Sequence, residues 1–417
     1  MKFEDYRIAP EIKQSLTNLA FRRPTDIQYK SIPPILKGED VLAIAQTGTG
    51  KTAAFAIPII QLINQQIEKG NVSGIQCVVL VPTRELSIQI TEVFNDIARY
   101  TKVVTLSVHG GVDQDPQINE LKRGVDILVA TPGRMFDLVS QKHIKLNKVK
   151  TIILDEADHM LDLGFIKDIH DLIKFIPRRH QTLFFSATID AKIKKLAYSL
   201  VSNPIRIQIS PKDPVAKNIE HAVATIEMDD KRFFLERFIN ENPDSKMLVF
   251  VRTKVRAERV LKALERVNIT SQTIHGGKDQ DDRFEVMNNF KDGLNNILIA
   301  TDVSSRGIDI PNVDFVINYD LPEKVENYVH RVGRTGRASK KGKAISFCSK
   351  GEREILKEIE DYLEKPVSKL DISKGDYLQT IEFSDESHSD WKTLINQAAE
   401  IEKKKKKKMK SSKKKKK

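Results

Sequence analysis

The sequence predicts an α/β protein of two tandem domains, each a parallel sheet with helices on both faces, followed by a disordered basic tail. Three observations support this fold class. Short β-branched runs alternate with helical patterns, the two halves of the chain resemble each other, and the last residues are nearly all lysine. Alternating strands and helices are typical of parallel sheets whose connecting helices cover both faces.

The strands expected in the first half are 41–45, 76–81, 103–108, 125–129, 149–154 and 182–185. Those expected in the second half include 221–226, 246–251, 296–300, 313–318 and 343–348. Between the halves, SPKDPVAKN contains two prolines and no hydrophobic period, which indicates a linker. The expected organisation is a first domain at 1–209, a linker at 210–218, a second domain at 219–366 and an extension at 367–417.

The two halves share three short motifs in the same order. The matched pairs are VVLVPTR (78–84) with LVFVRTK (248–254), VHGGVDQD (108–115) with IHGGKDQD (274–281), and ILVAT (127–131) with ILIAT (297–301). Buried strands often look alike, but the shared HGG-x-DQD pattern extends beyond them. We therefore interpret the halves as copies of one domain.

The basic charge is concentrated at the end of the chain. The 417 residues carry a net charge of +12, and KKKKKKMKSSKKKKK at 403–417 contains 12 lysines and no acid. The rest is therefore neutral overall, and self-repulsion should keep the tail disordered. No apolar run is long enough for a membrane, and MKFEDYRIAPEIK resembles no signal peptide, so we expect a cytoplasmic protein. Cys77 and Cys348 are isolated in strand-like runs and should be buried free thiols.

A phosphate-binding loop is predicted at AQTGTGKT (45–52), which follows the strand VLAIA and precedes the helical run AAFAIPIIQLI. Glycines let backbone N–H groups approach phosphates, and the helix N-terminus favours the anion. Lys51 would contact the β and γ oxygens and Thr52 would hold Mg²⁺. The predicted nucleotide contacts of the loop are Ala45, Gln46, Thr47, Gly48, Thr49, Gly50, Lys51 and Thr52. The second half lacks such a loop, so the two domains should share one nucleotide.

An acidic cluster follows the apolar strand in KTIILDEADHM (150–160). Carboxylates this close repel one another, and a metal ion with its phosphates would offset that repulsion. Asp155 is predicted to hold the metal, largely through water, and Glu156 to polarise the attacking water. Asp158 lies too far along to share the metal and should couple to other motifs. A solvated acidic turn is the alternative for these residues taken alone.

Arginines at HRVGRTGR (330–337) are predicted to complete the site from the second half. Arg331, Arg334 and Arg337 are spaced by threes among glycines. In GTPases an arginine delivered across an interface accelerates hydrolysis by ~10³–10⁵-fold. Domain closure would then trigger hydrolysis, although a basic helix end with a general surface role is the alternative.

Taken together, these motifs resemble the DEAD-box ATP-dependent RNA helicases of superfamily 2, in a bacterial type with a lysine-rich tail, over about residues 1–365. The matching motifs are AQTGTGKT, PTREL (82–86), GG (110–111), TPGR (131–134), DEAD (155–158), SAT (186–188), VFVRT (249–253), QDDR (280–283), ATDVSSRGIDI (300–310) and HRVGRTGR. The resemblance implies two RecA-like domains that close over ATP, Mg²⁺ and single-stranded RNA. RNA-stimulated ATP hydrolysis would then open short RNA duplexes locally or remodel ribonucleoproteins.

The resemblance also implies roles for single residues. Phe3 would stack on adenine, and Arg23 and Gln28 in FRRPTDIQ would read its edge. The other implied roles are ribose contact by Asp309, arginine fingers at Arg334 and Arg337, and coupling of hydrolysis to unwinding by Asp158, Ser186, Thr188 and His330. Two departures fall in the adenine-reading segment: Ala20 stands where glycine is common, and Asp26 where proline is.

RNA contacts carried over from the family fall on strand ends and glycine turns. They are Pro82, Thr83, Arg84, Gly110, Gly111, Thr131, Gly133 and Arg134 in the first half, and Arg252, Thr253, Gly276, Arg283 and Thr301 in the second. Backbone N–H groups and arginines suit phosphates, so sequence preference should be weak, and 2′-OH contacts would favour RNA over DNA. For each glycine pair alone, a plain tight turn is the alternative.

The extension beyond 365 contains no recognised motif. Residues 389–402 could form a short amphipathic helix or a weakly structured connector. The lysine run favours sequence-independent RNA affinity, with a nuclear address as the alternative. The expected partners are single-stranded and duplex RNA for a monomer, and association with ribosomes or other ribonucleoproteins is compatible with this. An ATP-gated RNA clamp with slow turnover, a DNA helicase and a tail-driven RNA-annealing protein remain alternative functions.

Overall fold

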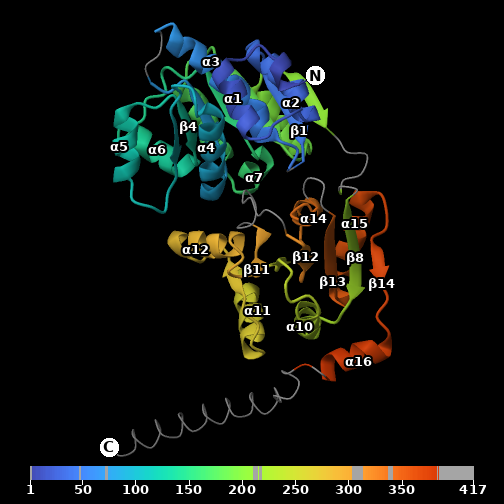
Figure 1. The fold of residues 1–417 in the computed structure, drawn as a ribbon. Coiled ribbons are helices and arrows are strands. Elements are labelled where there is room, and N and C mark those ends of the chain that lie inside the picture. The colour runs from blue at the N-terminus through green and yellow to red at the C-terminus, as the bar shows by residue number, and fades with distance from the viewer. Residues whose placement is uncertain are drawn as a thin grey trace, which may run out of the picture.

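The computed structural model describes residues 2–46, 48–70, 74–209, 215, 218–302, 313–336, 341–382 and 384. Several predictions fall outside these residues: the roles of Thr47, Asp309 and Arg337, most of the linker, the helix at 389–402 and the lysine tail. Within them, the chain forms two α/β domains stacked one above the other (Figure 1). No helix in these ranges is both long and apolar enough to cross a membrane.

The first domain is built on a parallel sheet with the strand order β3-β4-β2-β5-β6-β1-β7. Its strands are β1 (Val41–Ala45), β2 (Cys77–Leu80), β3 (Thr105–Val108), β4 (Ile127–Ala130), β5 (Thr151–Leu154), β6 (Gln181–Ser186) and β7 (Ile205–Ile209). Its helices are α1 (Pro10–Asn18), α2 (Asp26–Leu36), α3 (Lys51–Glu68), α4 (Arg84–Ala98), α5 (Asp115–Arg123), α6 (Pro132–Ser140), α7 (Ala157–Asp162), α8 (Ile166–Phe175) and α9 (Ala191–Leu200).

The second domain is built on a parallel sheet with the strand order β10-β11-β9-β12-β13-β8-β14. Its strands are β8 (Ile219–Thr225), β9 (Met247–Phe250), β10 (Gln272–Ile274), β11 (Ile297–Ala300), β12 (Phe315–Asn318), β13 (Gly342–Cys348) and β14 (Ser368–Leu370). The elements around it are α10 (Lys231–Glu241), α11 (Lys254–Arg266), α12 (Gln280–Lys291), α14 (Val325–Val332), η2 (Lys350–Glu352), α15 (Arg353–Leu363) and α16 (Lys374–Glu382).

The two sheets have the same topology. Each strand of the second domain takes the place of its counterpart seven strands earlier, as expected for copies of one domain. The predicted fold class is therefore confirmed. Both sheets have an apolar layer on each face; in the first, Phe55 of α3 packs against Phe94 of α4 and Phe185 of β6, with ring centroids 6.0 and 5.1 Å apart.

Three strands escaped prediction, and one of them shifts a domain boundary. β7, β10 and β14 are short or largely exposed, so they carry no apolar run. β14 pairs with β8, and Tyr377 of α16 packs on Phe234 of α10 with ring centroids 4.8 Å apart. The expected end of the second domain at 366 is therefore too early, because its sheet runs to Leu370.

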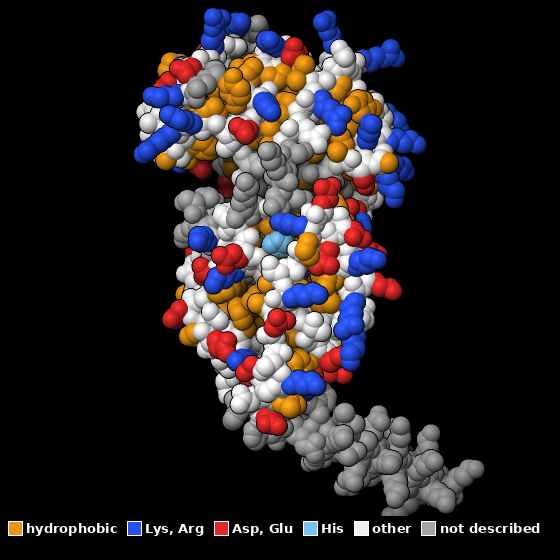
Figure 2. All heavy atoms as spheres, turned by 90° about the vertical axis from the view of Figure 1, so that its right-hand side faces the viewer, with side chains coloured by type: hydrophobic (Ala, Val, Ile, Leu, Met, Phe, Trp, Pro, Cys, Tyr) orange, Lys and Arg blue, Asp and Glu red, His pale blue; other side chains and the backbone are white. Residues whose placement is uncertain are grey.

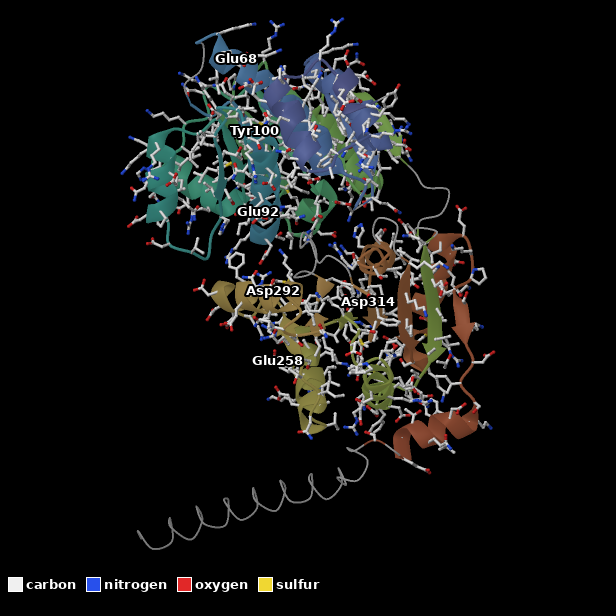
Figure 3. The ribbon with its side chains drawn as sticks, viewed as in Figure 1. Glu68, Glu92, Tyr100, Glu258, Asp292 and Asp314 are labelled. Carbon is white, nitrogen blue, oxygen red and sulfur yellow. The ribbon has the colours of Figure 1, made fainter. Side chains whose placement is uncertain are left out.

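Polar side chains connect the ends of two pairs of elements, and two of these side chains, Tyr100 and Asp314, are labelled in Figure 3. Asn18 at the end of α1 donates a hydrogen bond of 2.8 Å to the Tyr100 hydroxyl, just after α4. In the second domain, the Asp314 carboxylate accepts a hydrogen bond of 2.9 Å from the Lys246 N–H, which links the starts of β9 and β12. Cys77 and Cys348 are buried free thiols, as predicted.

The segment between α1 and α2 explains both departures from the family pattern. Thr25 caps α2 in a capping box with Gln28, and Asp26 occupies the first turn, where a carboxylate interacts favourably with the helix dipole. An aspartate can therefore replace proline there. Ala20 has φ = 58°, the left-handed region that glycine adopts without strain. The chain thus keeps the glycine conformation without the glycine.

We expect Ala20→Gly to raise the free energy of unfolding by about 0.5–1 kcal/mol. It would relieve left-handed strain, partly offset by the greater entropy of glycine in the unfolded chain. Denaturant unfolding would measure the change. Ala191→Gly, at the exposed first position of α9, is the control and should be slightly destabilising. Equal effects of the two substitutions would contradict the explanation.

Candidate functional site

The predicted phosphate loop lies between β1 and α3 and is closed by its own hydrogen bonds. Gly48 and Gly50 have φ of 78° and 89°, which glycine adopts without strain. Thr49 Oγ1 donates to the Gln46 carbonyl at 2.8 Å, and the buried Lys51 Nζ donates to the Ala45 carbonyl at 2.8 Å. Lys51 therefore holds the loop curled over the end of β1.

Gln28 connects this loop to the segment predicted to read adenine. Its side chain is 1% exposed, its Oε1 accepts from the Thr25 N–H at 3.0 Å, and its Nε2 donates to the Gly50 carbonyl at 3.1 Å. A Cβ on Gly50 would lie 2.5 Å from Gln28 Nε2, so the contact requires glycine. Gln28 thus fixes the loop against the start of α2.

Phe3 and Arg23 differ in accessibility. The Phe3 ring is buried, edge-on to Phe21 at a centroid distance of 5.9 Å and beside Tyr6. Arg23 is exposed in the turn before α2. The aromatic group predicted to stack on a base is therefore covered by other aromatic rings in this structure, whereas Arg23 is accessible.

The acidic cluster begins where β5 ends. Asp155 is 3% exposed and accepts a hydrogen bond from the Glu156 N–H at 3.0 Å. Burial raises the pKa of Asp155 to about 6, against the lowering effect of the Lys51 charge. A buried carboxylate with a raised pKa gains from a nearby cation, so Asp155 and Thr52 suit Mg²⁺, which prefers oxygen ligands and keeps several of its waters.

Glu156 is strained and surrounded by positive groups. Its φ of 50° is in the left-handed region, and such strain in a non-glycine residue clusters at functional sites. Its Oε2 lies 3.5 Å from His159 Nδ1. Burial alone would raise the pKa of Glu156, but His159, Lys51 and Arg334 together lower it. Because Arg334 belongs to the second domain, both domains act on this carboxylate.

Asp158 bridges the acidic cluster to the end of β6. Its Oδ2 accepts hydrogen bonds from the Ala187 and Thr188 N–H groups at 3.1 Å and from Thr188 Oγ1 at 3.2 Å. Ser186, beside them, is fully buried. Asp158 and the motif at 186–188 are thus joined by direct hydrogen bonds.

Arg331 and Arg334 of HRVGRTGR are not equivalent. Arg331 is 1% exposed, pairs with both oxygens of Asp302 at 2.6 and 2.8 Å, and lies over the Phe250 ring. It therefore holds the second domain together. Arg334 lies close enough to Glu156 to lower its pKa. His330 lies on α14 with Arg331, and Arg334 follows the end of this helix.

Three predicted RNA-contacting arginines gather around one glycine turn. Burial and the charges of Arg283 and Arg134 lower the pKa of Arg84. Gly111 has φ = 78°, and a Cβ there would lie 1.6 Å from Arg84 Nη1. Arg134 Nη2 donates to the Val112 carbonyl at 2.9 Å, and its buried Nη1 has no hydrogen-bond partner among the described residues. Guanidinium groups crowded in this way suit a phosphate.

Arg283 also joins the two domains. Its Nη2 lies 2.7 Å from Glu85 Oε1, and both side chains are mostly buried. A second interdomain pair links Lys324 to Asp162. Sequence reasoning assigned no role to Glu85, Asp162 or Lys324. Glu85 lies within the quoted PTREL motif, but nothing in the sequence indicates that its partner comes from the other domain.

Three of the five predicted RNA residues of the second domain line a cavity of about 450 Å³ against α7 of the first. Arg252, Gly276 and Thr301 line it together with Asp162 and Lys324. The remaining predicted positions follow the internal repeat: Thr83 caps α4 through the Leu86 N–H, and Thr253 caps α11 through the Arg256 N–H. Pro82 and Thr131 lie at the same edge of the first sheet, and Gly133 lies in the first turn of α6.

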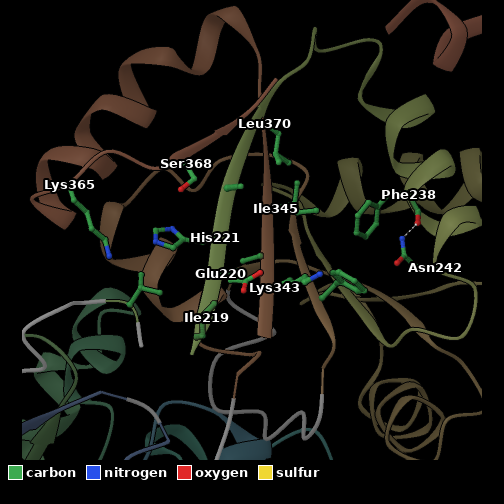
Figure 4. Close-up of a pocket in the computed structure, with 14 residues that line it drawn as sticks. Ile219, Glu220, His221, Phe238, Asn242, Lys343, Ile345, Lys365, Ser368 and Leu370 are labelled. Carbon is green, nitrogen blue, oxygen red and sulfur yellow. Dashed lines mark hydrogen bonds between the residues drawn. The ribbon is translucent and has the colours of Figure 1, made fainter. Parts of the chain in front are cut away.

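Another hollow, of about 870 Å³, opens along β8 of the second domain (Figure 4). It is lined by residues of β8, β13, α10 and the segment after α15, among them His221, Phe238, Lys343 and Lys365, and none of the predicted site residues borders it. We therefore place the candidate site at the facing edges of the two domains.

On the face shown in Figure 2, basic side chains predominate over the first domain and mix with acidic ones over the second.

Comparison with known proteins agrees with this arrangement. Residues 25–196 match the DEAD/DEAH box helicase model, and residues 230–339 match the helicase conserved C-terminal domain. The chain is 40% identical over 370 residues to the ATP-dependent RNA helicase DbpA of Bacillus subtilis, covering 88% of this chain and 76% of the relative.

Solved structures match over both domains. S. cerevisiae Dbp5 bound to RNA and ADP BeF3 superposes with a TM-score of 0.80 at 30% identity, covering 91% of this chain and 98% of that chain. The DEAD-box helicase Mss116 bound to ssRNA and UDP-BeF superposes with a TM-score of 0.81 at 29% identity, covering 91% and 81%.

Two RecA-like domains, with a phosphate loop in one and an arginine of the other beside its acidic strand end, define the core of a nucleotide-driven helicase. The similarity to DbpA places the chain within that class, because it extends over both domains. The protein belongs to the DEAD-box helicase family.

We expect Gln28→Ala to weaken ATP binding about tenfold, because it removes both buried hydrogen bonds that hold the phosphate loop against α2. Titration with a fluorescent ATP analogue in the absence of RNA would measure the affinity. Tyr29→Ala, a truncation of the exposed neighbour on the same helix, is the control and should change it little. Unchanged affinity in Gln28→Ala would contradict this role for Gln28.

Proposed function

We propose that the protein is an RNA-dependent ATPase that opens short RNA duplexes or remodels ribonucleoproteins locally, without long translocation along the strand. The observation that carries this proposal is that groups of both domains, His159 and Lys51 of the first and Arg334 of the second, lower the pKa of the Glu156 carboxyl. Hydrolysis would then depend on how the domains meet. RNA bound across both domains would favour that meeting and so accelerate turnover.

Within the first domain, the phosphate loop and the acidic strand end have different roles in binding and hydrolysing ATP. The loop N–H groups and Lys51 bind and orient the phosphates. Thr52 and Asp155 would hold Mg²⁺, which would neutralise charge that develops on the phosphate oxygens. Glu156, kept ionised by its neighbours, orients the attacking water and accepts its proton.

Arginines from the second domain would complete the site. Arg334 is suited to stabilise negative charge that grows as the bond to the terminal phosphate breaks. Arg337 and Asp309 are proposed to act beside it on the phosphates and the ribose. Arg23, Gln28 and Phe3 are proposed to select adenine, Phe3 after its ring is released from Phe21.

RNA would lie along the opposing motifs of the two domains. Glycine turns and arginines contact the sugar-phosphate backbone and carry little sequence information, so we expect weak sequence preference. Dbp5 bound to RNA supports RNA as the ligand, and Mss116 bound to ssRNA supports the single-stranded form. Asp158, Ser186, Thr188 and His330 would relay the nucleotide state to this path.

We expect strong stimulation of ATP hydrolysis by single-stranded RNA and little by DNA of the same sequence. Glu156→Gln should lower turnover at least ~10²-fold, because it removes the group that accepts the proton. Steady-state ATPase assays without nucleic acid, with RNA and with DNA would measure this. Hydrolysis indifferent to RNA, in a protein that still binds RNA, would instead favour an ATP-gated clamp.

Two glycines with the same backbone conformation offer a matched test of the RNA path. Gly111→Ala should raise the RNA concentration for half-maximal stimulation at least about fivefold, because the new Cβ would displace Arg84 and strain the turn. Gly38→Ala should change it little, since Gly38 has a similar φ of 79° but no atom lies within 4 Å of the added Cβ. Titration of ATPase activity with RNA would compare them, and equal effects would show that this turn does not position Arg84 for RNA.

A further inference from the structure

A buried carboxylate in the second domain connects the core to one of the proposed RNA contacts. Glu352 of η2 is 2% exposed and accepts five hydrogen bonds. Its Oε1 accepts from the Leu321 N–H at 3.1 Å and from Arg252 Nη2 at 3.2 Å. Its Oε2 accepts from Lys231 Nζ at 2.6 Å, and from the N–H and hydroxyl of Ser349 at 3.0 and 2.8 Å.

Lys231 has no exposed surface and is held from several sides. Beyond Glu352, its Nζ donates to the Tyr319 carbonyl at 2.7 Å and lies 3.8 Å from Asp320 Oδ1. Burying two charges costs solvation energy that their attraction rarely exceeds, so a buried ion pair is weak evidence for a role in stability alone. Glu352 Oε2 accepts the hydrogen bond from Lys231, and Glu352 Oε1 accepts the one from Arg252.

Arg252 lies between this buried network and the cavity that faces the first domain. Its Nη2 is taken by Glu352 and by the Leu321 carbonyl at 3.3 Å, and its backbone N–H donates to Asp320 Oδ2 at 3.1 Å. Its buried Nε has no hydrogen-bond partner among the described residues, with Glu323 Oε1 3.9 Å away. The guanidinium is thus fixed at one corner, while the side chain of Arg252 stays 33% exposed and lines the cavity, where a ligand can reach it.

The internal repeat marks this arrangement as particular to the second domain. When VVLVPTR is aligned with LVFVRTK, Arg252 takes the place of Pro82, so the first domain has no side chain to be oriented in this way. The two turns otherwise agree closely, because Thr83 and Thr253 cap their helices with φ of −130° and −133°. The second copy therefore differs by a charged side chain on the cavity wall.

We infer that Glu352, itself anchored by Lys231, is a positioning residue that holds the Arg252 guanidinium in place for an RNA phosphate. This inference rests on the proposed RNA-binding function and deepens it. A long arginine side chain loses rotamer freedom when it binds, and fixing it beforehand removes that cost. Glu352 acts only through Arg252 and does not touch RNA.

A double-mutant cycle in the full chain tests the inference. The affinity for a short single-stranded RNA would be measured by fluorescence anisotropy, with a non-hydrolysable ATP analogue, at several salt concentrations. Arg252→Ala should weaken binding about tenfold and lower the salt slope by about one, as loss of a phosphate contact does. Glu352→Gln should weaken binding about three- to tenfold, and the double variant should match Arg252→Ala within about twofold.

Asp40→Asn is the control for a general loss of stability. Asp40 accepts from the Thr182 and Ser202 N–H groups at 2.7 Å in the first domain, and its substitution should leave RNA affinity unchanged. If Glu352→Gln does not fold, Glu352→Asp keeps the charge but withdraws it from Arg252 and enters the same cycle. Effects of Arg252 and Glu352 that multiply, or wild-type affinity in either single variant, would overturn the inference. Absent RNA stimulation of the wild-type ATPase would count against the proposed function alone.

Discussion

Two carboxylates lie side by side at the end of a buried strand, and the arrangement of the groups around them depends on this pairing. Asp155 and Glu156 could not share that position at low cost without positive charge nearby. Lys51 supplies it from the phosphate loop, and Arg334 supplies it from the second domain. An arrangement that needs charge from elsewhere is sensitive to where that charge lies. The same repulsion that makes the site costly makes it responsive to the approach of the second domain.

The duplicated topology gives the two domains equivalent sheet edges. Parallel strands of each sheet end at one edge, and each edge carries an equivalent threonine-capped helix and glycine turn. The two copies differ in sequence at matching positions, and these differences give the domains different roles. The phosphate loop is found only in the first copy, and the arginine in place of Pro82 only in the second. The two copies thus share one edge architecture and differ in the residues that carry the proposed chemistry.

Patterns confined to one stretch of sequence were predictable. VLAIA, AQTGTGKT and AAFAIPIIQLI predict a strand, a loop and a helix in that order, and this order is typical of the α/β fold class. Features that need partners from distant segments were not predictable. SKL at 368–370 becomes a strand only because β8 lies beside it, Glu85 gains meaning only from Arg283, and Arg331 proved to be a core residue. The sequence spacing of HRVGRTGR cannot distinguish Arg331, which pairs with Asp302, from Arg334, whose charge lowers the pKa of Glu156.

The deep burial of both thiols has a practical consequence for observing domain motion. Burial raises the pKa of Cys77 and brings that of Cys348 to about 11, so neither offers an accessible thiolate at neutral pH. The two native cysteines should therefore react very slowly with maleimide dyes. A fluorophore pair could be attached through one introduced surface cysteine in each domain without first removing the native ones. The distance between the domains could then be followed in single molecules while nucleotide and RNA come and go.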